Sequence, residues 1–354
     1  MSSKITIIGA GSVGSTIAYT LAHDEIASEI VLIDINKEKV EGEVMDIEQG
    51  TCFRSPVSLV AGDYADAKDS DIVIITSGIA RKPGQTRIEL TQTNVNILKS
   101  ITPQIVKEAP DAKYIIVSNP VDIMTYVFTK ISGLPENQIM GSGTILDTAR
   151  LRYGLSEHFK VAQGNIHAYV FGEHGDTSFI PWTGAYISGL STDEYYEEMK
   201  AHGKDVKPLD KEAMLEYVQK SGGKVIAKKG ATFYAVSATV CQLVGLILAA
   251  SDSLATVSSM LHGEYGIEDV CLSTLTLVGP NGTQGKVQMR MNKEEVALLK
   301  RVLMPERSNR TDRTVRTRFC CLHFTGKINS QCRAQDFIFN YTSKDIPGFY
   351  RGKR

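Results

Sequence analysis

Short apolar runs alternate with longer amphipathic segments along the first third of the chain. The runs Ile5–Ile8 and Glu29–Ile33 are rich in β-branched residues, and Ser15–His23 between them has apolar residues at helical spacing. Further runs at Ile72–Thr76 and Tyr114–Val117 are each followed by turn residues. Strands that alternate with helix-length segments favour right-handed crossovers and a mostly parallel sheet. The pattern therefore predicts an α/β fold built on a doubly wound parallel sheet.

The alternation becomes less regular after about residue 145. Asn165–Phe171 and Ser273–Val278 have the apolar content of strands, whereas Lys211–Val225 and Lys229–Ser259 have the spacing of long helices. Asn292–Arg301 is expected to form a short helix, because a capping Asn precedes two acidic residues and an apolar stripe. This mixture of elements predicts a second domain of the α+β class.

Residues 304–354 differ from the chain before them. The helical pattern ends after Leu303, and the following segment is rich in Arg, Ser, Thr and Asn without a sustained period. We expect this segment to be a separate, poorly ordered tail with no chemical role. The sheet domain is then expected to span residues 1–145 and the α+β domain residues 146–303.

The composition is that of an ordinary soluble globular protein. Of the 354 residues, 42% are hydrophobic and 22% are charged, and the formal net charge is −1. A charge so near zero gives no field that would attract nucleic acid or an anionic membrane, so neither is expected as a partner. No signal-peptide pattern or membrane-length apolar run is visible, which predicts a cytoplasmic protein. The six irregularly spaced cysteines favour reduced thiols, and no metal site is expected.

A glycine-rich turn follows the first predicted strand and opens the first predicted helix. It reads Gly9-Ala-Gly11-Ser-Val-Gly14, and Asp34 follows 20 positions after the last glycine, at the end of the next strand. These glycines permit a tight turn, a close approach of the backbone to a pyrophosphate, and packing of helix on strand. Asp34 would accept hydrogen bonds from the adenosine ribose, and its charge would repel the 2′-phosphate of NADP. The pattern predicts a Rossmann-type domain that binds NAD, and it disfavours an NADP-linked reductase.

Three polar clusters are candidates for catalysis, and each also has a plain structural interpretation. Arg81–Arg87 is a basic segment around a Pro-Gly turn, as in many surface loops. Asp147 and Arg150 share one face of a predicted helix, as surface ion pairs often do. His174 stands between glycines in the segment Gly172–Asp176. A lone histidine is more often structural, but loops of this kind commonly carry functional residues.

Through the joint occurrence of these motifs in this order, the sequence resembles the L-lactate/L-malate dehydrogenase family. It resembles the bacterial L-lactate members of that family most. The resemblance reaches to about Arg301 and is not visible beyond it. It implies reversible hydride transfer between a small 2-hydroxy acid and the corresponding 2-oxo acid. The matching segments are Gly9–Thr16, Arg81–Arg87, Val117–Pro120, Gly141–Arg152, His167–Thr177 and the stretch that begins at Asn281.

The resemblance implies a role for each polar residue. His174 would be the general base in alcohol oxidation and the general acid in ketone reduction, with Asp147 fixing its ring. Arg150 would clamp the substrate carboxylate, Arg87 would polarise the reacting C–O bond after loop closure, and Asn119 would orient substrate and nicotinamide. The implied catalytic residues are His174, Asp147 and Arg87, and the implied substrate-binding residues are Arg81, Arg87, Asn119, Arg150 and Thr232.

The same resemblance implies a set of residues along the cofactor channel, where NAD is the expected cofactor. The second domain would then be the substrate domain, and the expected substrate is a small 2-hydroxy or 2-oxo acid. The implied cofactor-binding residues are Gly9, Gly11, Val13, Gly14, Asp34, Lys39, Tyr64, Gly78, Ile79, Ser100, Val117, Ser118, Asn119 and Ser142.

The choice between lactate and malate rests on conflicting residues. Arg81 occupies the position that contacts the far end of the substrate, where an arginine would pair with the second carboxylate of malate. Glu173 before His174 and the segment Gly230–Thr232 resemble the lactate branch instead. The sequence therefore favours an L-lactate dehydrogenase, with an L-malate dehydrogenase as the alternative. A non-catalytic nucleotide-binding module is a further alternative, which the retained polar residues argue against.

Two other residues match an effector site of bacterial lactate dehydrogenases. Arg152 and His167 resemble the pair that binds fructose 1,6-bisphosphate between subunits, and both can carry the positive charge that phosphate requires. An ordinary surface arginine and strand histidine are the simpler interpretation. The resemblance also implies a homo-oligomer, typically a tetramer.

Overall fold

The computed structural model describes residues 3–54, 56–79 and 87–301. The α-helices of this part of the chain are α1 (Ser12–His23), α2 (Lys37–Gly50), α3 (Arg87–Glu108), α4 (Val121–Ser132), α5 (Ile145–Phe159), α6 (Thr192–Ala201), α7 (Lys211–Lys229), α8 (Tyr234–Leu248) and α9 (Lys293–Arg301). The strands are β1 (Lys4–Ile8), β2 (Glu29–Ile33), β3 (Ser58–Ala61), β4 (Ile72–Ile75), β5 (Lys113–Ile116), β6 (Ile139–Gly141), β7 (Ile166–His167), β8 (Tyr186–Ile187), β9 (Leu190–Ser191), β10 (Ser253–Ala255), β11 (Ser258–His262), β12 (Glu268–Ser273), β13 (Thr276–Gly279) and β14 (Gly282–Lys286).

An eight-stranded sheet in the order β12-β11-β6-β5-β4-β1-β2-β3 forms the centre of the molecule. The six strands from β6 to β3 are parallel, which confirms the predicted doubly wound sheet. The strand order reverses between β1 and β4, and a ligand crevice is expected at the carboxyl ends of strands at such a point. Every candidate cofactor residue that follows a strand of this sheet lies at that edge.

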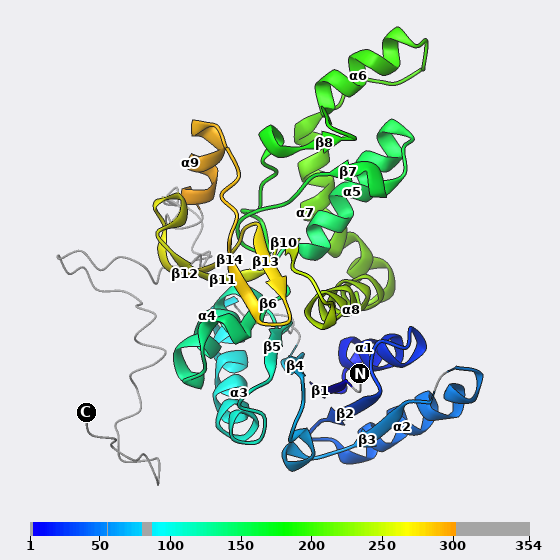
Figure 1. Ribbon diagram of the computed structural model, residues 1–354, viewed down its shortest axis with the longest axis vertical. Helices are drawn as coiled ribbons and strands as arrows, with labels where there is room; N and C mark the ends of the chain where they lie inside the picture. The colour runs from blue at the N-terminus through cyan, green and yellow to red at the C-terminus, as the bar shows by residue number, and fades with distance from the viewer. Residues whose placement is uncertain (1–2, 55, 80–86, 302–354) are drawn as a thin grey trace, which may run out of the picture.

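Helices cover both faces of the sheet, with α1 and α2 on one side and α3 and α4 on the other (Figure 1). The strands alternate their side chains between the two layers: Ile72 and Ile74 pack with α1, whereas Val73 and Ile75 pack with α3 and α4. Because both faces are buried, strands such as Ile72–Ile75 are apolar throughout. The continuous apolar runs of the sequence therefore predicted these strands correctly.

The large sheet continues beyond the first 145 residues. Strands β11 and β12, which belong to the expected second domain, pair antiparallel at its edge, and Ser258 of β11 lies opposite Gly141 of β6. The second part of the chain also forms two small antiparallel sheets, β7-β8-β9 and β10-β13-β14. This confirms the mixed α+β character that the sequence predicts there.

Three element predictions in this part were wrong. Ser273–Val278 is not one strand, because β12 ends at Ser273 and β13 begins at Thr276. Lys229–Ser259 is not one helix, because α7 ends at Lys229 and α8 ends at Leu248. Gly230 caps α7 with a φ of +84°, which a non-glycine residue rarely adopts. The polar-apolar alternation that follows forms β10 and β11 instead. The predicted strand Asn165–Phe171 is reduced to the two residues of β7, with Phe171 in a separate bridge to Phe179.

The last described helix, α9, is capped as predicted. The Asn292 side chain accepts a hydrogen bond from the Glu295 backbone, and the Glu295 carboxylate accepts one from the Asn292 backbone. The predicted tail, residues 304–354, lies outside the described residues. Among the residues described, no helix is long and apolar enough to cross a membrane, and no cluster of His, Cys, Asp and Glu is arranged to hold a metal ion.

Candidate active site

The glycine-rich turn joins β1 to α1 in a shape that only glycines permit. Gly9 has a φ of +112°, and a Cβ at Gly14 would lie 1.8 Å from the carbonyl oxygen of Gly9. The chain and the helix can therefore approach this closely only without side chains. Gly11 differs, because a Cβ built there meets no atom within 4 Å. Its missing side chain leaves free surface above the turn rather than relieving an internal clash.

The start of α1 and the end of β2 form a polar cradle beside this turn. Gly11 caps α1 without a side-chain hydrogen bond, so the first backbone N–H groups of the helix are available for an anion. Asp34 accepts hydrogen bonds from the backbone N–H groups of Ala10 at 2.7 Å and Asn36 at 3.1 Å. Its carboxylate is thereby fixed at the rim of the glycine turn. Free surface, helix N–H groups and a fixed carboxylate are the features that a dinucleotide requires.

Other predicted cofactor residues line the same edge of the sheet. Gly78 and Ile79 follow β4, residues 117–119 follow β5, and Ser142 follows β6. Tyr64 lies in a short 3-10 helix near Asp34, and its burial, followed by the charge of Asp34, raises its pKa.

Two predicted cofactor residues lie in exposed helical positions. Lys39 is near the start of α2, with its ammonium 3.9 Å from Glu43, and Ser100 on α3 donates a hydrogen bond to the carbonyl of Ile97. The geometry of the described residues connects neither of them to the glycine turn.

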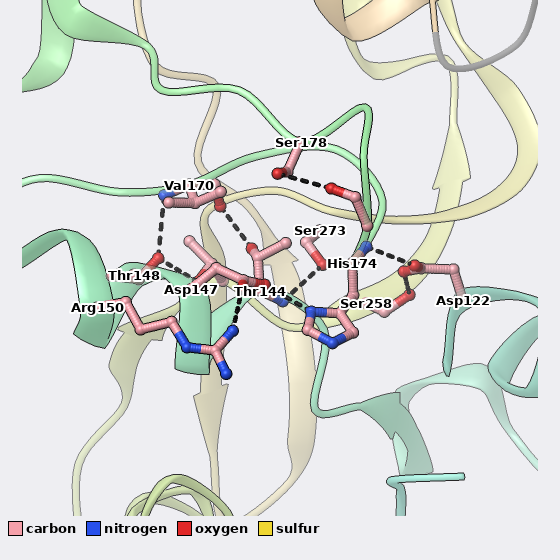
Figure 2. Close-up of polar contacts among 12 residues, drawn as sticks. Asp122, Thr144, Asp147, Thr148, Arg150, Val170, His174, Ser178, Ser258 and Ser273 are labelled. Atoms are coloured by element: carbon pink, nitrogen blue, oxygen red, sulfur yellow. Dashed lines mark hydrogen bonds and ion pairs between the residues drawn. The ribbon is translucent and has the colours of Figure 1, made fainter. Parts of the chain in front are cut away.

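His174, Asp147 and Arg150 form one hydrogen-bonded cluster (Figure 2). Asp147 is almost fully buried on α5, and its two carboxylate oxygens have different partners. One lies 2.6 Å from Nδ1 of His174, and the other accepts a hydrogen bond from Arg150 at 2.9 Å. The predicted pairing of Asp147 and Arg150 on one helical face is thus confirmed, and His174 joins them from the loop that follows β7.

Charge and burial act on this cluster in opposite directions. The carboxylate of Asp147 is the main cause that raises the pKa of His174, against the opposing effect of burial. Burial would raise the pKa of Asp147, but the positive charges and hydrogen bonds of His174 and Arg150 outweigh it and hold that pKa below its usual value. The His174 side chain remains 30% exposed, so it can both hold a proton and reach a ligand.

A second buried carboxylate, Asp122, contacts the same histidine and was not predicted from the sequence. It lies in the first turn of α4 and accepts hydrogen bonds from the backbone N–H of His174 at 2.8 Å and from the hydroxyl of Ser258 at 2.6 Å. Burial is the main cause that raises the pKa of Asp122 to about 6. An acidic residue after Asn-Pro at the end of a buried strand was the available signal.

A cavity of about 290 Å³ joins the catalytic cluster to the cofactor edge. Its wall brings together residues that the sequence analysis selected separately, including His174, Asn119 and Thr232. Gln219 on α7 was not predicted; its side chain donates to the carbonyls of Asp176 and Ser178 and so holds the His174 loop against α7. The cavity is lined by Val13, Val117, Asn119, Leu146, Asp147, Arg150, His174, Gly175, Asp176, Gln219, Gly222, Gly223, Ile226, Thr232 and Val236.

Two predicted substrate-binding residues cannot be compared with this cavity. Arg81 lies outside the described residues, and the structure describes only the backbone of Arg87, the first residue of α3. The predicted effector residues lie elsewhere. Arg152 donates to the carbonyl of Ala168, with its guanidinium 5.2 Å from the ring of Tyr169, and His167 is exposed on β7. Neither lines the cavity, as the helical geometry predicts for Arg152.

Comparison with known proteins gives matches along most of the chain. Residues 3–141 match the family model for the lactate/malate dehydrogenase NAD binding domain, and residues 144–305 match that for the alpha/beta C-terminal domain of the same family. An L-lactate dehydrogenase from Acetivibrio thermocellus is 48% identical over 84% of this chain and 93% of its own. L-lactate dehydrogenase 1 from Clostridium acetobutylicum is also 48% identical, over 82% and 92%. The crystal structure of a minor L-lactate dehydrogenase from Enterococcus mundtii has a TM-score of 0.81 at 34% identity, covering 85% and 95%.

Proposed function

The chain belongs to the lactate/malate dehydrogenase family, and we propose that it is an NAD-dependent L-lactate dehydrogenase that interconverts (S)-lactate and pyruvate. The observation that carries the proposal is the His174–Asp147–Arg150 cluster in the wall of one cavity with Asn119 and Thr232. Similarity to relatives named L-lactate dehydrogenase supports lactate rather than malate as the substrate of this chain.

The glycine turn and Asp34 fit NAD. Gly11 leaves free surface beside the N–H groups of α1 for the pyrophosphate, and the fixed carboxylate of Asp34 suits a ribose with free hydroxyls. NAD, when bound, supplies the hydride acceptor of lactate oxidation, and NADH the donor of the reverse reaction. The residues at the ends of β4, β5 and β6 would support the cofactor along the edge of the sheet.

His174 moves the proton. In pyruvate reduction its protonated ring donates to the developing alkoxide, and in lactate oxidation its neutral ring accepts the hydroxyl proton. Asp147 holds Nδ1, which leaves Nε2 for the substrate and stabilises the imidazolium. Arg150, one edge of which Asp147 already fixes, binds the substrate carboxylate. We assign to Arg87 the polarisation of the reacting C–O bond, on the strength of the family resemblance.

Steady-state assays of NADH oxidation with pyruvate and with oxaloacetate test the proposal. We expect a higher kcat/KM for pyruvate, and we expect His174→Gln to abolish most turnover while NADH still binds. A clear preference for oxaloacetate would establish the second candidate, an L-malate dehydrogenase, which Arg81 favours because it would pair with a second carboxylate. Absence of turnover with every 2-oxo acid would support a non-catalytic nucleotide-binding module.

Arg81→Gln separates the two substrate assignments further. If Arg81 contacts the far end of the substrate, removal of its charge raises kcat/KM for pyruvate and lowers it for oxaloacetate. Unchanged ratios would mean that Arg81 contacts neither substrate. Glu89→Gln, in the first turn of α3, is a control for a change of charge near this segment.

We also propose an effector site at Arg152 and His167, which binds fructose 1,6-bisphosphate. Its support is an exposed imidazole on β7, followed directly by Ala168, the carbonyl of which holds Arg152. Titration with the bisphosphate at low pyruvate should raise the rate of the wild type and not that of Arg152→Gln. Equal responses would refute the assignment.

The remaining proposals concern organisation and location. A cytoplasmic homo-oligomer, typically a tetramer, is supported by the family and by exposed apolar side chains, among them Phe53, which is 84% exposed beside a groove between α1 and α2. Light scattering after size exclusion reports the mass, and a monomer would exclude an oligomer.

We retain the expected boundary between residues 1–145 and 146–303, which the separate family matches support.

A further inference from the structure

The catalytic histidine is held by two carboxylates, of which only one contacts its ring. Asp147 lies against the imidazole, and Asp122 lies on the other side of His174 and accepts a hydrogen bond from its backbone (Figure 2). Asp122 is 3% exposed, and both its oxygens have hydrogen-bond partners. No Lys or Arg of the described residues forms an ion pair with it. The positive charge that acts on Asp122 is that of the His174 ring.

The segment that carries His174 needs an external support. Gly172 has a φ of +98°, and Gly175 follows His174 by one position, so glycines with wide conformational freedom flank the histidine. The Gly172 backbone exchanges two hydrogen bonds with Ser273 of β12, which fixes the start of the segment. His174 lies two positions after Gly172, and its backbone N–H donates to Asp122.

Asp122 joins three elements that are remote in sequence. It belongs to α4, it accepts from the His174 loop, and its other oxygen accepts from Ser258, the first residue of β11. Ser258 lies opposite Gly141 in the central sheet, so Asp122 connects the loop to that sheet through hydrogen bonds. A buried carboxylate is costly unless its oxygens are satisfied, and here two donors satisfy it.

We infer that Asp122 is a positioning residue for the reaction proposed above: its carboxylate fixes the backbone of His174 while Asp147 fixes the ring, and its charge favours the imidazolium. The charged and titratable groups around it are known. Asp147 and Arg150 face His174 from α5, Glu173 adjoins it in the loop, and Cys271 of β12 is near Asp122. Glu173 raises the pKa of Asp122, whereas His174 lowers it.

Two variants separate geometry from charge. Asp122→Asn keeps an oxygen that accepts from His174 and gains an amide that can donate to Ser258, so it removes the charge alone. Asp122→Ala removes both bonds. The control is Asp269→Asn. This variant removes an exposed carboxylate that pairs with Lys130, and Lys130 lies in the last turn of α4.

We expect Asp122→Asn to shift the pH dependence of kcat/KM for pyruvate to lower pH, because a lost negative charge lowers the pKa of His174. The difference from the wild type should shrink below about pH 6, where Asp122 itself becomes protonated. Asp122→Ala should lower kcat by about tenfold to a hundredfold through misplacement of His174, with the Kd for NADH unchanged. The inference would be overturned if the pH dependence of kcat/KM in Asp122→Asn and the kcat of Asp122→Ala both equalled those of the wild type.

A measurement without turnover keeps this test separate from the proposed function. NMR titration of the histidine rings gives the pKa of His174, whose signals are identified by their loss in His174→Gln, and we expect a lower value in Asp122→Asn than in the wild type or Asp269→Asn. An unchanged value would refute the charge effect even if pyruvate is not the substrate. Failure of the wild type to reduce pyruvate, with the NMR shift present, would refute the substrate assignment alone. If Asp122→Ala does not fold, the Asn variant still decides.

Discussion

The candidate active site has two sides, here called its walls, which are built in different ways: the glycine turn with the cofactor edge of the sheet, and the cluster around His174. The wall formed by the large sheet and α1 presents mainly backbone, with glycines where the chain must come close and N–H groups at the helix start. The wall formed by α5 and the His174 loop presents buried charged side chains that hold one another. The first wall is suited to cofactor binding, and the second to substrate binding and proton transfer. Substitutions on the two walls should therefore change different constants.

The largest effect is expected on the side-chain wall. His174→Gln should lower kcat for pyruvate by about a thousandfold, because the variant cannot donate a proton, while the Kd for NADH stays near that of the wild type. Rapid-mixing kinetics and NADH fluorescence measure the two constants. His202→Gln, which changes an exposed histidine at the end of α6, should behave as the wild type. Loss of NADH binding in His174→Gln would mean that the two walls are not separable.

Arg150→Lys should have the next largest effect. A lysine keeps the charge but loses the second prong of the guanidinium, and a hydrogen bond between charged groups contributes about 1.5 to 3 kcal/mol. We expect KM for pyruvate to rise by tenfold to a hundredfold, with a smaller change in kcat. Steady-state kinetics at saturating NADH decide this, and an unchanged KM would exclude Arg150 as the carboxylate ligand.

A pair of glycine substitutions tests the backbone wall. Gly14→Ala places a Cβ against the Gly9 carbonyl and should cost about 1 to 3 kcal/mol of unfolding free energy. Gly11→Ala meets no neighbour, so its stability should stay within about 0.5 kcal/mol of the wild type. Its Kd for NADH should nevertheless rise about tenfold, because the added methyl occupies the free surface above the turn. Urea unfolding and NADH titration compare the two, and equal stabilities would contradict the distinction.

The smallest effect is on stability as a function of pH. Folding raises the pKa of His174, so the protonated ring contributes to the free energy of unfolding. This contribution is fully present below the pKa of the unfolded state and is lost as the pH rises through the pKa of the folded state. The unfolding free energy of the wild type should thus fall more than that of His174→Gln as the pH rises above about 6.5, the ordinary pKa of histidine. Asp147 acts oppositely: its lowered pKa gives stability that is lost as the solution becomes acidic. Parallel curves for both proteins would show that the pair adds nothing to folding.

The sequence predicted the backbone wall better than the side-chain wall, and the reason is range. The glycine turn and the strands are local patterns, and the pairing of Asp147 with Arg150 needs only a helix. Asp122, in contrast, lies 52 positions from His174 and 136 from Ser258, so only the folded chain brings them together. Gln219 is a similar case, because its partners are carbonyls, which leave no mark in a sequence.

The wrong helix prediction has a related cause. Lys229–Ser259 contains a long apolar stretch, and periodicity alone does not distinguish a buried helix from a helix followed by buried strands. Strand β10, at the end of that segment, forms by pairing with β13, and β11 forms by pairing with β6 and β12, so both depend on partners that are remote in sequence. Gly230, which caps α7, was in contrast a local signal that the sequence contained.

The hydrogen bond between Asp34 and the backbone of Ala10 has a consequence for engineering. The residue that would discriminate NAD from NADP also latches the glycine turn to β2. Replacement by a basic residue, or by a neutral residue without an acceptor oxygen, would remove that hydrogen bond at the same time. A redesigned enzyme would therefore need a second acceptor for the Ala10 N–H, and variants chosen for charge alone should bind both cofactors weakly.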